Sequence, residues 1–195
     1  MVKEKVTQRT LQSINTRKRI FDVAIELIRE QGFDSVTIEN ISKKAGVSVG
    51  AFYHHFDSKS DVIYEIFKQI DEYFENEVLN QLSGTSIEKI NAFFGYYAEF
   101  IIDQGIDFIK QLYTTKNKLF IKKDRYLWVC LKTLILEGQA NNEISTEKSA
   151  EEIMDFIFIF VRGVVFDWCL HDGEYDLKAV LLADIKQILC VFKSG

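Results

Sequence analysis

Residues 37–59 read T-I-E-N-I-S-K-K-A-G-V-S-V-G-A-F-Y-H-H-F-D-S-K, and this stretch decides the fold. Thr37 precedes a short amphipathic segment as a capping residue, Gly46 supplies a tight turn, and Ser48 caps a second short segment. Residues 58–61 then resemble a capping box that opens a third helix. Two short helices joined by a glycine turn form a helix-turn-helix, whose second helix enters the major groove of duplex DNA.

Several side chains of this stretch favour contact with DNA. Gly50 costs its helix up to about 1 kcal/mol relative to alanine, and a missing side chain would let the backbone approach a duplex. Lys59 lies at the wrong end of the helix dipole for a cation, whereas a phosphate there would meet both the ammonium and free N–H groups. Tyr53 and His54 suit phosphate or sugar contacts. Each observation has an alternative explanation without DNA. Glycine in the first turn of a helix costs little, so Gly50 need not face a duplex, and Lys59 can be a solvated surface lysine.

Charge is divided unevenly along the chain. The net charge is −5, but residues 1–60 hold ten Lys/Arg and seven Asp/Glu, whereas residues 61–195 hold fourteen and twenty-two. Six of the first twenty residues are basic and one is acidic. We therefore expect a DNA-binding domain at 1–60, with a flexible basic tail over about 1–12, and an acidic domain at 61–195.

Composition predicts an all-α protein. The chain has no proline, and glycines stand where amphipathic segments end. Residues 156–160 have strand-like composition, but they lie within a long helical period. The helices are expected at about 14–31, 38–45, 49–56, 58–83, 86–103, 106–115, 121–137, 146–171 and 177–192.

The sequence also limits where the protein acts. No apolar run reaches the length of a membrane span, and the N-terminus lacks the apolar region of a signal peptide. The three cysteines have no C-x-x-C spacing, which is typical of buried, reduced thiols. We expect a cytoplasmic protein that contacts no membrane.

The pattern G-F-x-x-V-T-I-x-x-I-S-x-x-A-G-V-S-x-G-A-F-Y-H-H-F-x-S-K, at residues 32–59, resembles the N-terminal signature of the tetracycline-repressor (TetR/AcrR) family of bacterial transcriptional regulators. The resemblance covers residues 15–63. It implies an all-helical homodimer, usually a repressor, with a three-helix DNA-binding domain. It also implies a larger domain that binds an inducer and dimerises through its last two helices.

By position, the resemblance implies DNA contacts at seven residues. Thr37 and Lys59 would bind phosphate, Tyr53 and His54 would contact the backbone, and three residues would lie near base edges: Ser48, Val49 and Gly50. Relatives often carry a longer polar or basic residue at position 49. Valine cannot hydrogen-bond a base but can contact a thymine methyl, so the operator sequence does not follow from the motif.

Large aromatic residues spread over the C-terminal half suit an apolar ligand pocket, although most of them can equally fill a helical core. The candidate pocket residues are Phe93, Tyr97, Phe100, Tyr113, Trp128, Phe158 and Arg162. Arg162 is the candidate anchor for an anionic group, and an ion pair with Asp155 or Asp167 is its alternative role.

The last helix carries a wide apolar stripe, which can be buried within its own domain or against a partner. With the resemblance, this favours a homodimer interface that includes Phe166, Leu177, Leu181 and Ile188.

We therefore expect a regulator that binds a palindromic duplex operator as a homodimer and is released by a largely apolar small molecule. A DNA-binding dimer without a small-molecule ligand is the alternative. A helical enzyme is disfavoured because G-x-S-x-G, H-E-x-x-H and phosphate-binding glycine loops are absent. We expect no cofactor and no metal, since adjacent histidines such as His54 and His55 do not share a helix face.

Overall fold

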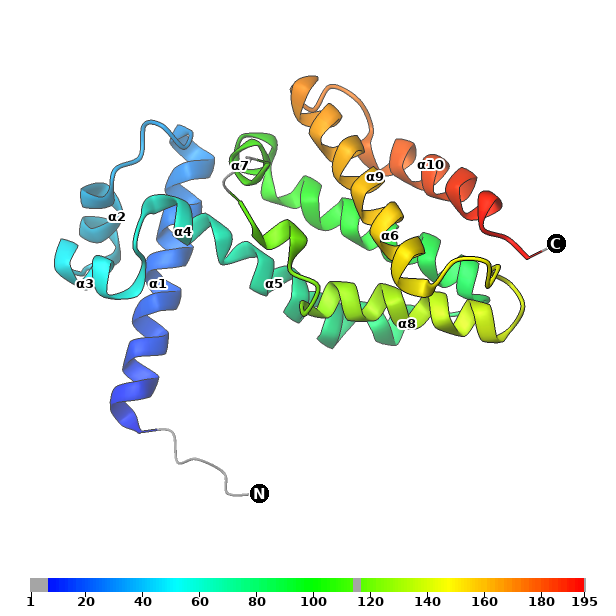
Figure 1. Ribbon diagram of the computed structural model, residues 1–195. Coiled ribbons are helices and arrows are strands. Elements are labelled where there is room, and N and C mark those ends of the chain that lie inside the picture. The colour runs from blue at the N-terminus through cyan, green and yellow to red at the C-terminus, as the bar shows by residue number, and fades with distance from the viewer. Residues whose placement is uncertain (1–6, 114–116, 195) are drawn as a thin grey trace. The chain divides into compact units, whose positions relative to one another are not determined.

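The computed structural model describes residues 7–113 and 117–194, and within these ranges the chain forms helices and no β-strand (Figure 1). The predicted all-α class is confirmed. None of the described helices is both long and apolar enough to cross a membrane. The helices are α1 (Gln8–Gln31), α2 (Ile38–Ala45), α3 (Val49–His55), α4 (Lys59–Tyr64), α5 (Ile66–Tyr73), α6 (Ser86–Gln104), α7 (Ile106–Leu112), α8 (Tyr126–Ala140), α9 (Ala150–Leu170) and α10 (Leu177–Val191).

The chain divides into two compact units, one ending at Glu65 and the other beginning at Ile66. In the N-terminal unit, α1 buries Ile20, Ala24 and Ile28 in a core that Ile41 and Phe52 share. Each of these five side chains is fully buried. The unit is therefore a small helical domain with a core of its own.

Local chemistry fixes the angle between α2 and α3. A capping box between Thr37 and Asn40 begins α2, and Gly46 ends it in the left-handed conformation (φ 65°, ψ 38°). Glycine adopts this conformation without steric cost. The Ser48 hydroxyl then accepts from the Ala51 N–H at 3.1 Å and begins α3.

Two predicted helix boundaries are wrong near the N-terminus. Helix α1 begins at Gln8 and not at about residue 14, because the Thr7 side chain caps it by accepting from the Thr10 N–H. The long helix expected after residue 58 is interrupted at Glu65, whose N–H donates to the Val62 carbonyl in a tighter turn.

The C-terminal half also differs from the prediction in detail. Residues 74–78 form a π-helical turn that continues α5, and residues 119–121 form a 3₁₀ turn ahead of α8. Helix α9 begins at Ala150, because Ser149 and Glu152 form a capping box there. The predicted 106–115 helix ends at Leu112, and residues 114–116 lie outside the described ranges.

The C-terminal unit is built around α6, which packs against both α8 and α10. Helix α9 packs against the same two helices, so the four form one layered bundle (Figure 1). Its centre is aromatic: the rings of Phe74 and Phe93 lie 4.6 Å apart, and those of Phe93 and Phe94 lie 5.0 Å apart.

A single ion pair joins α5 to the start of α8. Arg125 donates from Nε to Asp71 Oδ2 at 2.9 Å and from Nη2 to Oδ1 at 3.1 Å. Oδ1 also accepts from the Leu127 N–H at 3.1 Å. Because Arg125 precedes α8 and does not cap it with its own side chain, the Asp71 carboxylate caps that helix from outside.

We predict that Asp71→Asn lowers the free energy of unfolding by about 2 kcal/mol, because the guanidinium loses a charged bidentate partner. The Arg125 and Asp71 side chains are only 10% and 19% exposed, so solvent replaces that partner poorly. Glu72→Gln, on the same helix but exposed, should change stability by less than about 0.5 kcal/mol. Urea titrations of both variants test this, and equal effects would contradict the capping role.

Candidate DNA interface and ligand pocket

Helix α3 presents an exposed face that carries most of the predicted DNA contacts. Ser48, Val49, Gly50, Tyr53 and His54 are all exposed. The opposite face is held in place by Phe52, which is fully buried. The surface is therefore rigidly backed and free to enter a groove.

Nothing that packs against Gly50 within the subunit explains why this position is a glycine. A Cβ built there would meet only the Ser48 Oγ, at 3.9 Å, among the described atoms. Packing within the chain therefore does not require glycine. The observation favours close approach of an external surface, as the sequence predicts.

Thr37 lies exposed at the N-terminus of α2, where its hydroxyl takes part in the capping box. Its Oγ1 donates to Asn40 Oδ1 at 2.8 Å and accepts from the Asn40 N–H at 3.2 Å. The side chain is available at the surface, and a phosphate there would compete with Asn40.

Lys59 has a structural role that the sequence does not reveal. Its ammonium donates to the carbonyls of Phe33 and Val36, the latter at 2.6 Å, and lies 3.9 Å from the centre of the Phe33 ring. Partial burial lowers the pKa of the Lys59 amine. Without DNA, the ammonium thus ties the start of α4 to the loop between α1 and α2. An ammonium has three donors, so one remains for the predicted phosphate.

We predict two separable effects of Lys59→Ala. Removing the bonds to two carbonyls should lower the free energy of unfolding by about 1–2 kcal/mol. Removing one phosphate-binding cation should weaken binding to operator and to random DNA by similar factors. It should also reduce the slope of log affinity against log salt concentration by about one unit.

The matched control is Lys43→Ala, because Lys43 is exposed on α2. It should leave thermal stability within about 0.5 kcal/mol of the parent. If the salt slope of the Lys59→Ala protein is unchanged, Lys59 does not bind a phosphate and has only its structural role.

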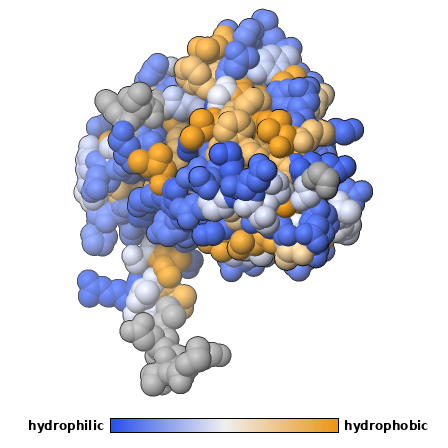
Figure 2. Space-filling model, turned by 45° about the vertical axis from the view of Figure 1, so that its right-hand side comes forward, coloured by the Kyte–Doolittle hydropathy of each residue, from blue (hydrophilic) through white to orange (hydrophobic). Residues whose placement is uncertain are grey.

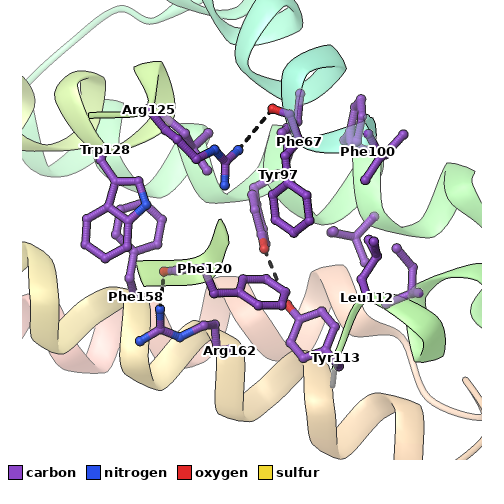
Figure 3. Close-up of a pocket in the computed structure, with 15 residues that line it drawn as sticks. Phe67, Tyr97, Phe100, Leu112, Tyr113, Phe120, Arg125, Trp128, Phe158 and Arg162 are labelled. Carbon is purple, nitrogen blue, oxygen red and sulfur yellow. Dashed lines mark hydrogen bonds between the residues drawn. The ribbon is translucent and has the colours of Figure 1, made fainter. Parts of the chain in front are cut away.

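The C-terminal unit contains a pocket enclosed by α5–α9 (Figure 3). The free cavity volume between its lining atoms is about 30 Å³. Aromatic rings fill most of the enclosed part. Six predicted residues line it, namely Tyr97, Phe100, Tyr113, Trp128, Phe158 and Arg162. A larger ligand must therefore displace side chains in order to enter.

The prediction for Phe93 is wrong. This ring is fully buried between Phe74 and Phe94 in the centre of the bundle and does not border the pocket. Aromatic spacing on a helix cannot separate a core position from a pocket position, since both faces are apolar.

Two pocket elements escape sequence reasoning because they lie outside the aromatic helices. Phe67, on α5, and Phe120, in the 3₁₀ turn, meet edge to face with ring centres 5.1 Å apart. The Arg125 guanidinium lies 4.6 Å from the centre of the Phe67 ring. The sequence does offer one sign of a special role for Arg125. It stands at the capping position of α8, where its own side chain cannot accept a hydrogen bond from the helix.

The polar groups of the pocket are few. The hydroxyls of Tyr97 and Tyr113 lie 3.4 Å apart, as the dashed line in Figure 3 marks. Burial raises the pKa of both phenols, so they stay neutral near pH 7. Apart from the two guanidinium groups, the pocket therefore offers an uncharged lining.

Arg162 points toward the 3₁₀ turn, and its Nη1 donates to the Phe120 carbonyl at 2.6 Å (Figure 3). The alternative ion pairs are not found among the described residues. Asp155 accepts from Lys123 at 2.6 Å, and Asp167 accepts from Tyr175 at 3.1 Å. Arg162 thus keeps a guanidinium at the pocket without a carboxylate partner in the described chain.

The predicted dimer residues need correction. Leu177, Leu181 and Ile188 are 1%, 0% and 9% exposed within one subunit, since α10 packs its apolar stripe on α6 and α9. A partner cannot reach them. Phe166 is 47% exposed, as an interface residue requires.

Other apolar side chains of α9 and α10 are exposed, and Figure 2, which turns that side forward, shows apolar residues gathered at the surface. They are Phe156, Ile159, Leu170, Val180 and Val191. The described residues contain no group of three side chains suited to bind a metal ion.

Comparison with known proteins identifies the N-terminal unit. Residues 20–66 match the family described as bacterial regulatory proteins, tetR family. The chain belongs to the TetR family. It is therefore a transcriptional regulator.

Relatives resemble this TetR-family chain over most of its length. The fatty acid metabolism regulator protein of Bacillus subtilis (strain 168) is 26% identical in an alignment that covers 83% of this chain and 88% of that protein. The structure of the fatty acid degradation regulator FadR from Bacillus halodurans is 25% identical, with a TM-score of 0.69 over 89% of this chain and 94% of that one.

A third similar structure is Thermus thermophilus FadR, a TetR-family transcriptional repressor in complex with lauroyl-CoA. It is 23% identical, with a TM-score of 0.69 over 89% of this chain and 93% of that one. At this identity the likeness concerns the fold.

Proposed function

We propose that this regulator is a homodimeric repressor that binds a palindromic operator and leaves it when a largely apolar ligand occupies the pocket. The observation that carries the proposal is an uncharged aromatic pocket bordered by the guanidinium group of Arg162. The FadR complex with lauroyl-CoA makes a fatty acyl-CoA the first candidate ligand. In this proposal, residues 61–195 form the domain that binds the ligand and dimerises.

The pocket suits an acyl chain better than a polar ligand. Its lining is aliphatic and aromatic, so burying the chain gains about 25 cal/mol per Å² of apolar surface. Arg162 and Trp128 also line a second, more open groove on the outside of the unit, together with Lys123. An anionic head group at this groove would meet the Arg162 guanidinium while its tail enters between the rings, whereas Lys123 is already paired with Asp155, which lines the same groove.

Ligand entry must rearrange the pocket because its rings leave little free space. Phe120 contacts both Phe67 and Tyr113, with ring centres 5.1 Å and 4.7 Å apart. Displacing Phe120 would also disturb its carbonyl bond to Arg162. Binding energy is thereby converted into a conformational change, which a regulator requires.

The change must reach DNA through the geometry of the dimer. Two recognition helices fit successive major grooves only when they lie about 34–36 Å apart. A ligand that favours another separation lowers operator affinity.

Operator release tests the proposal directly. A duplex is first selected from a randomised palindromic library with the parent protein, and its binding is followed by fluorescence anisotropy. Lauroyl-CoA should release it, whereas coenzyme A alone should not, because only the former fills the apolar pocket. Release by neither lauroyl-CoA nor dodecanoic acid would favour a dimer without such a ligand.

We predict that Leu112→Trp blocks this release and leaves operator affinity within about threefold of the parent. The larger side chain takes the space that a ligand needs, and Leu112 belongs to the C-terminal unit whereas α3 belongs to the N-terminal one. Leu136→Trp is the matched control, since Leu136 lies on α8 and is 50% exposed. It should respond to lauroyl-CoA as the parent does. An unaltered response of Leu112→Trp would place the ligand elsewhere.

We propose that the dimer interface lies on the exposed apolar side of α9 and α10. Phe166→Glu should then yield a folded monomer, whereas Leu181→Glu should fail to fold because it buries a carboxylate. Ile102→Glu, at an exposed position on α6, is the control and should remain dimeric. Sedimentation and circular dichroism separate these outcomes, and a dimeric Phe166→Glu protein would exclude this interface.

A further inference from the structure

Helix α1 projects beyond the core of its unit. Its buried residues begin at Ile20, and none of residues 8–19 is buried. At 1.5 Å per residue these twelve residues span about 18 Å. Figure 1 shows the start of α1 running out past α2, α3 and α4. Even Leu11 and Ile14 are 50% and 56% exposed, so core packing does not explain this segment.

The projecting segment is basic near its two ends, at residue 9 and at residues 17–19. Residues 8–19 contain Arg9, Arg17, Lys18 and Arg19 and no acidic residue. Arg9, in the first turn, opposes the helix dipole. Neither core packing nor the helix dipole therefore explains this basic residue, which suits an external anionic surface.

The DNA-reading part of the unit has the opposite charge. Residues 20–65 hold four Lys/Arg and eight Asp/Glu, a net charge of −4 with neutral histidines. Lys44 pairs with Glu26 at 3.0 Å, and Lys59 is bound to two carbonyls. Helix α3 contains no lysine or arginine. This region therefore has fewer cations than anions to set against DNA phosphates.

The basic segment leaves the domain beside the reading helix. Arg17 donates to the His55 carbonyl at the C-terminal end of α3, and its guanidinium lies 4.2 Å from the centre of the Phe56 ring. Arg17 also pairs with Glu65 at 2.8 Å, so it is a structural residue at the base of the segment. Arg9, Lys18 and Arg19 are exposed.

We propose that the first twelve residues of α1 form a second DNA-binding element, in which Arg9, Lys18 and Arg19 bind backbone phosphates that flank the site read by α3. Specificity then comes from α3 and affinity from α1. This inference rests on the proposed operator binding. It adds phosphate contacts to the one that Lys59 is predicted to make.

The test is the triple variant Arg9→Gln, Lys18→Gln and Arg19→Gln in the full chain. Glutamine keeps helix propensity, and circular dichroism checks that the fold is retained. The control carries the same loss of charge at exposed lysines of the C-terminal unit, namely Lys122→Gln, Lys148→Gln and Lys193→Gln. Affinities for the selected palindrome and for a random duplex are measured at several salt concentrations.

We expect the triple variant to bind both duplexes at least about tenfold more weakly near 0.1 M salt. Its log–log salt slope should fall by about 0.9 for each phosphate that the variant no longer neutralises, whereas the control keeps the parent slope. The ratio of affinities for the two duplexes should not change. A parent-like slope in the triple variant would overturn the proposal, as would a changed sequence preference with the slope intact. Failure of the parent to select any duplex would instead refute operator binding.

Discussion

The ion pair between Asp71 and Arg125 holds α5 against the start of α8 in the C-terminal unit of this regulator. It closes with two charge-assisted hydrogen bonds of 2.9 and 3.1 Å, and the same carboxylate caps α8 through the Leu127 N–H. Arg125 also donates to the Phe67 carbonyl at 3.1 Å and lies over that ring. One buried contact therefore fixes the start of α8, the end of the preceding loop and one wall of the pocket. On the opposite wall, Arg162 donates one hydrogen bond to the Phe120 carbonyl. The two walls of the pocket therefore differ in how firmly they are held.

Charge follows a division of labour within the DNA-binding unit. Residues 20–65 are acidic overall and α3 has no lysine or arginine, whereas four basic residues and no acidic one lie in the first twelve residues of α1. Phosphate contacts carry most of the salt-dependent affinity of DNA-binding proteins, and base contacts carry sequence preference. Separating the two on different helices allows each to change without the other. The C-terminal half is acidic overall, with fourteen Lys/Arg against twenty-two Asp/Glu over residues 61–195, so its net charge does not favour DNA.

The helix-turn-helix can be predicted from the sequence because the residues that determine it act locally. Thr37, Gly46 and Ser48 act through hydrogen bonds and backbone conformation within a few residues, so their spacing alone predicts α2 and α3. The pocket depends on contacts between distant segments, and the sequence distinguishes neither Phe93 in the core nor Arg125 at the wall. The apolar stripe of α10 likewise does not reveal whether Leu181 meets its own subunit or a partner, because both surfaces are apolar. The second role of Lys59 stays hidden for the same reason, since the carbonyls of Phe33 and Val36 lie more than twenty residues away in sequence.

Above all, we propose that the pocket and the operator are energetically coupled. Coupling between two binding sites is reciprocal, so a ligand that weakens DNA binding must itself bind more weakly to the DNA complex, by the same factor. Isothermal titration calorimetry of lauroyl-CoA with the free dimer, and with the dimer saturated by its selected duplex, measures that factor directly. We predict a reduction in ligand affinity by about 5–150-fold, equal to the reduction in operator affinity caused by saturating lauroyl-CoA. Equal affinity of lauroyl-CoA for the free and the DNA-bound dimer would contradict this coupling.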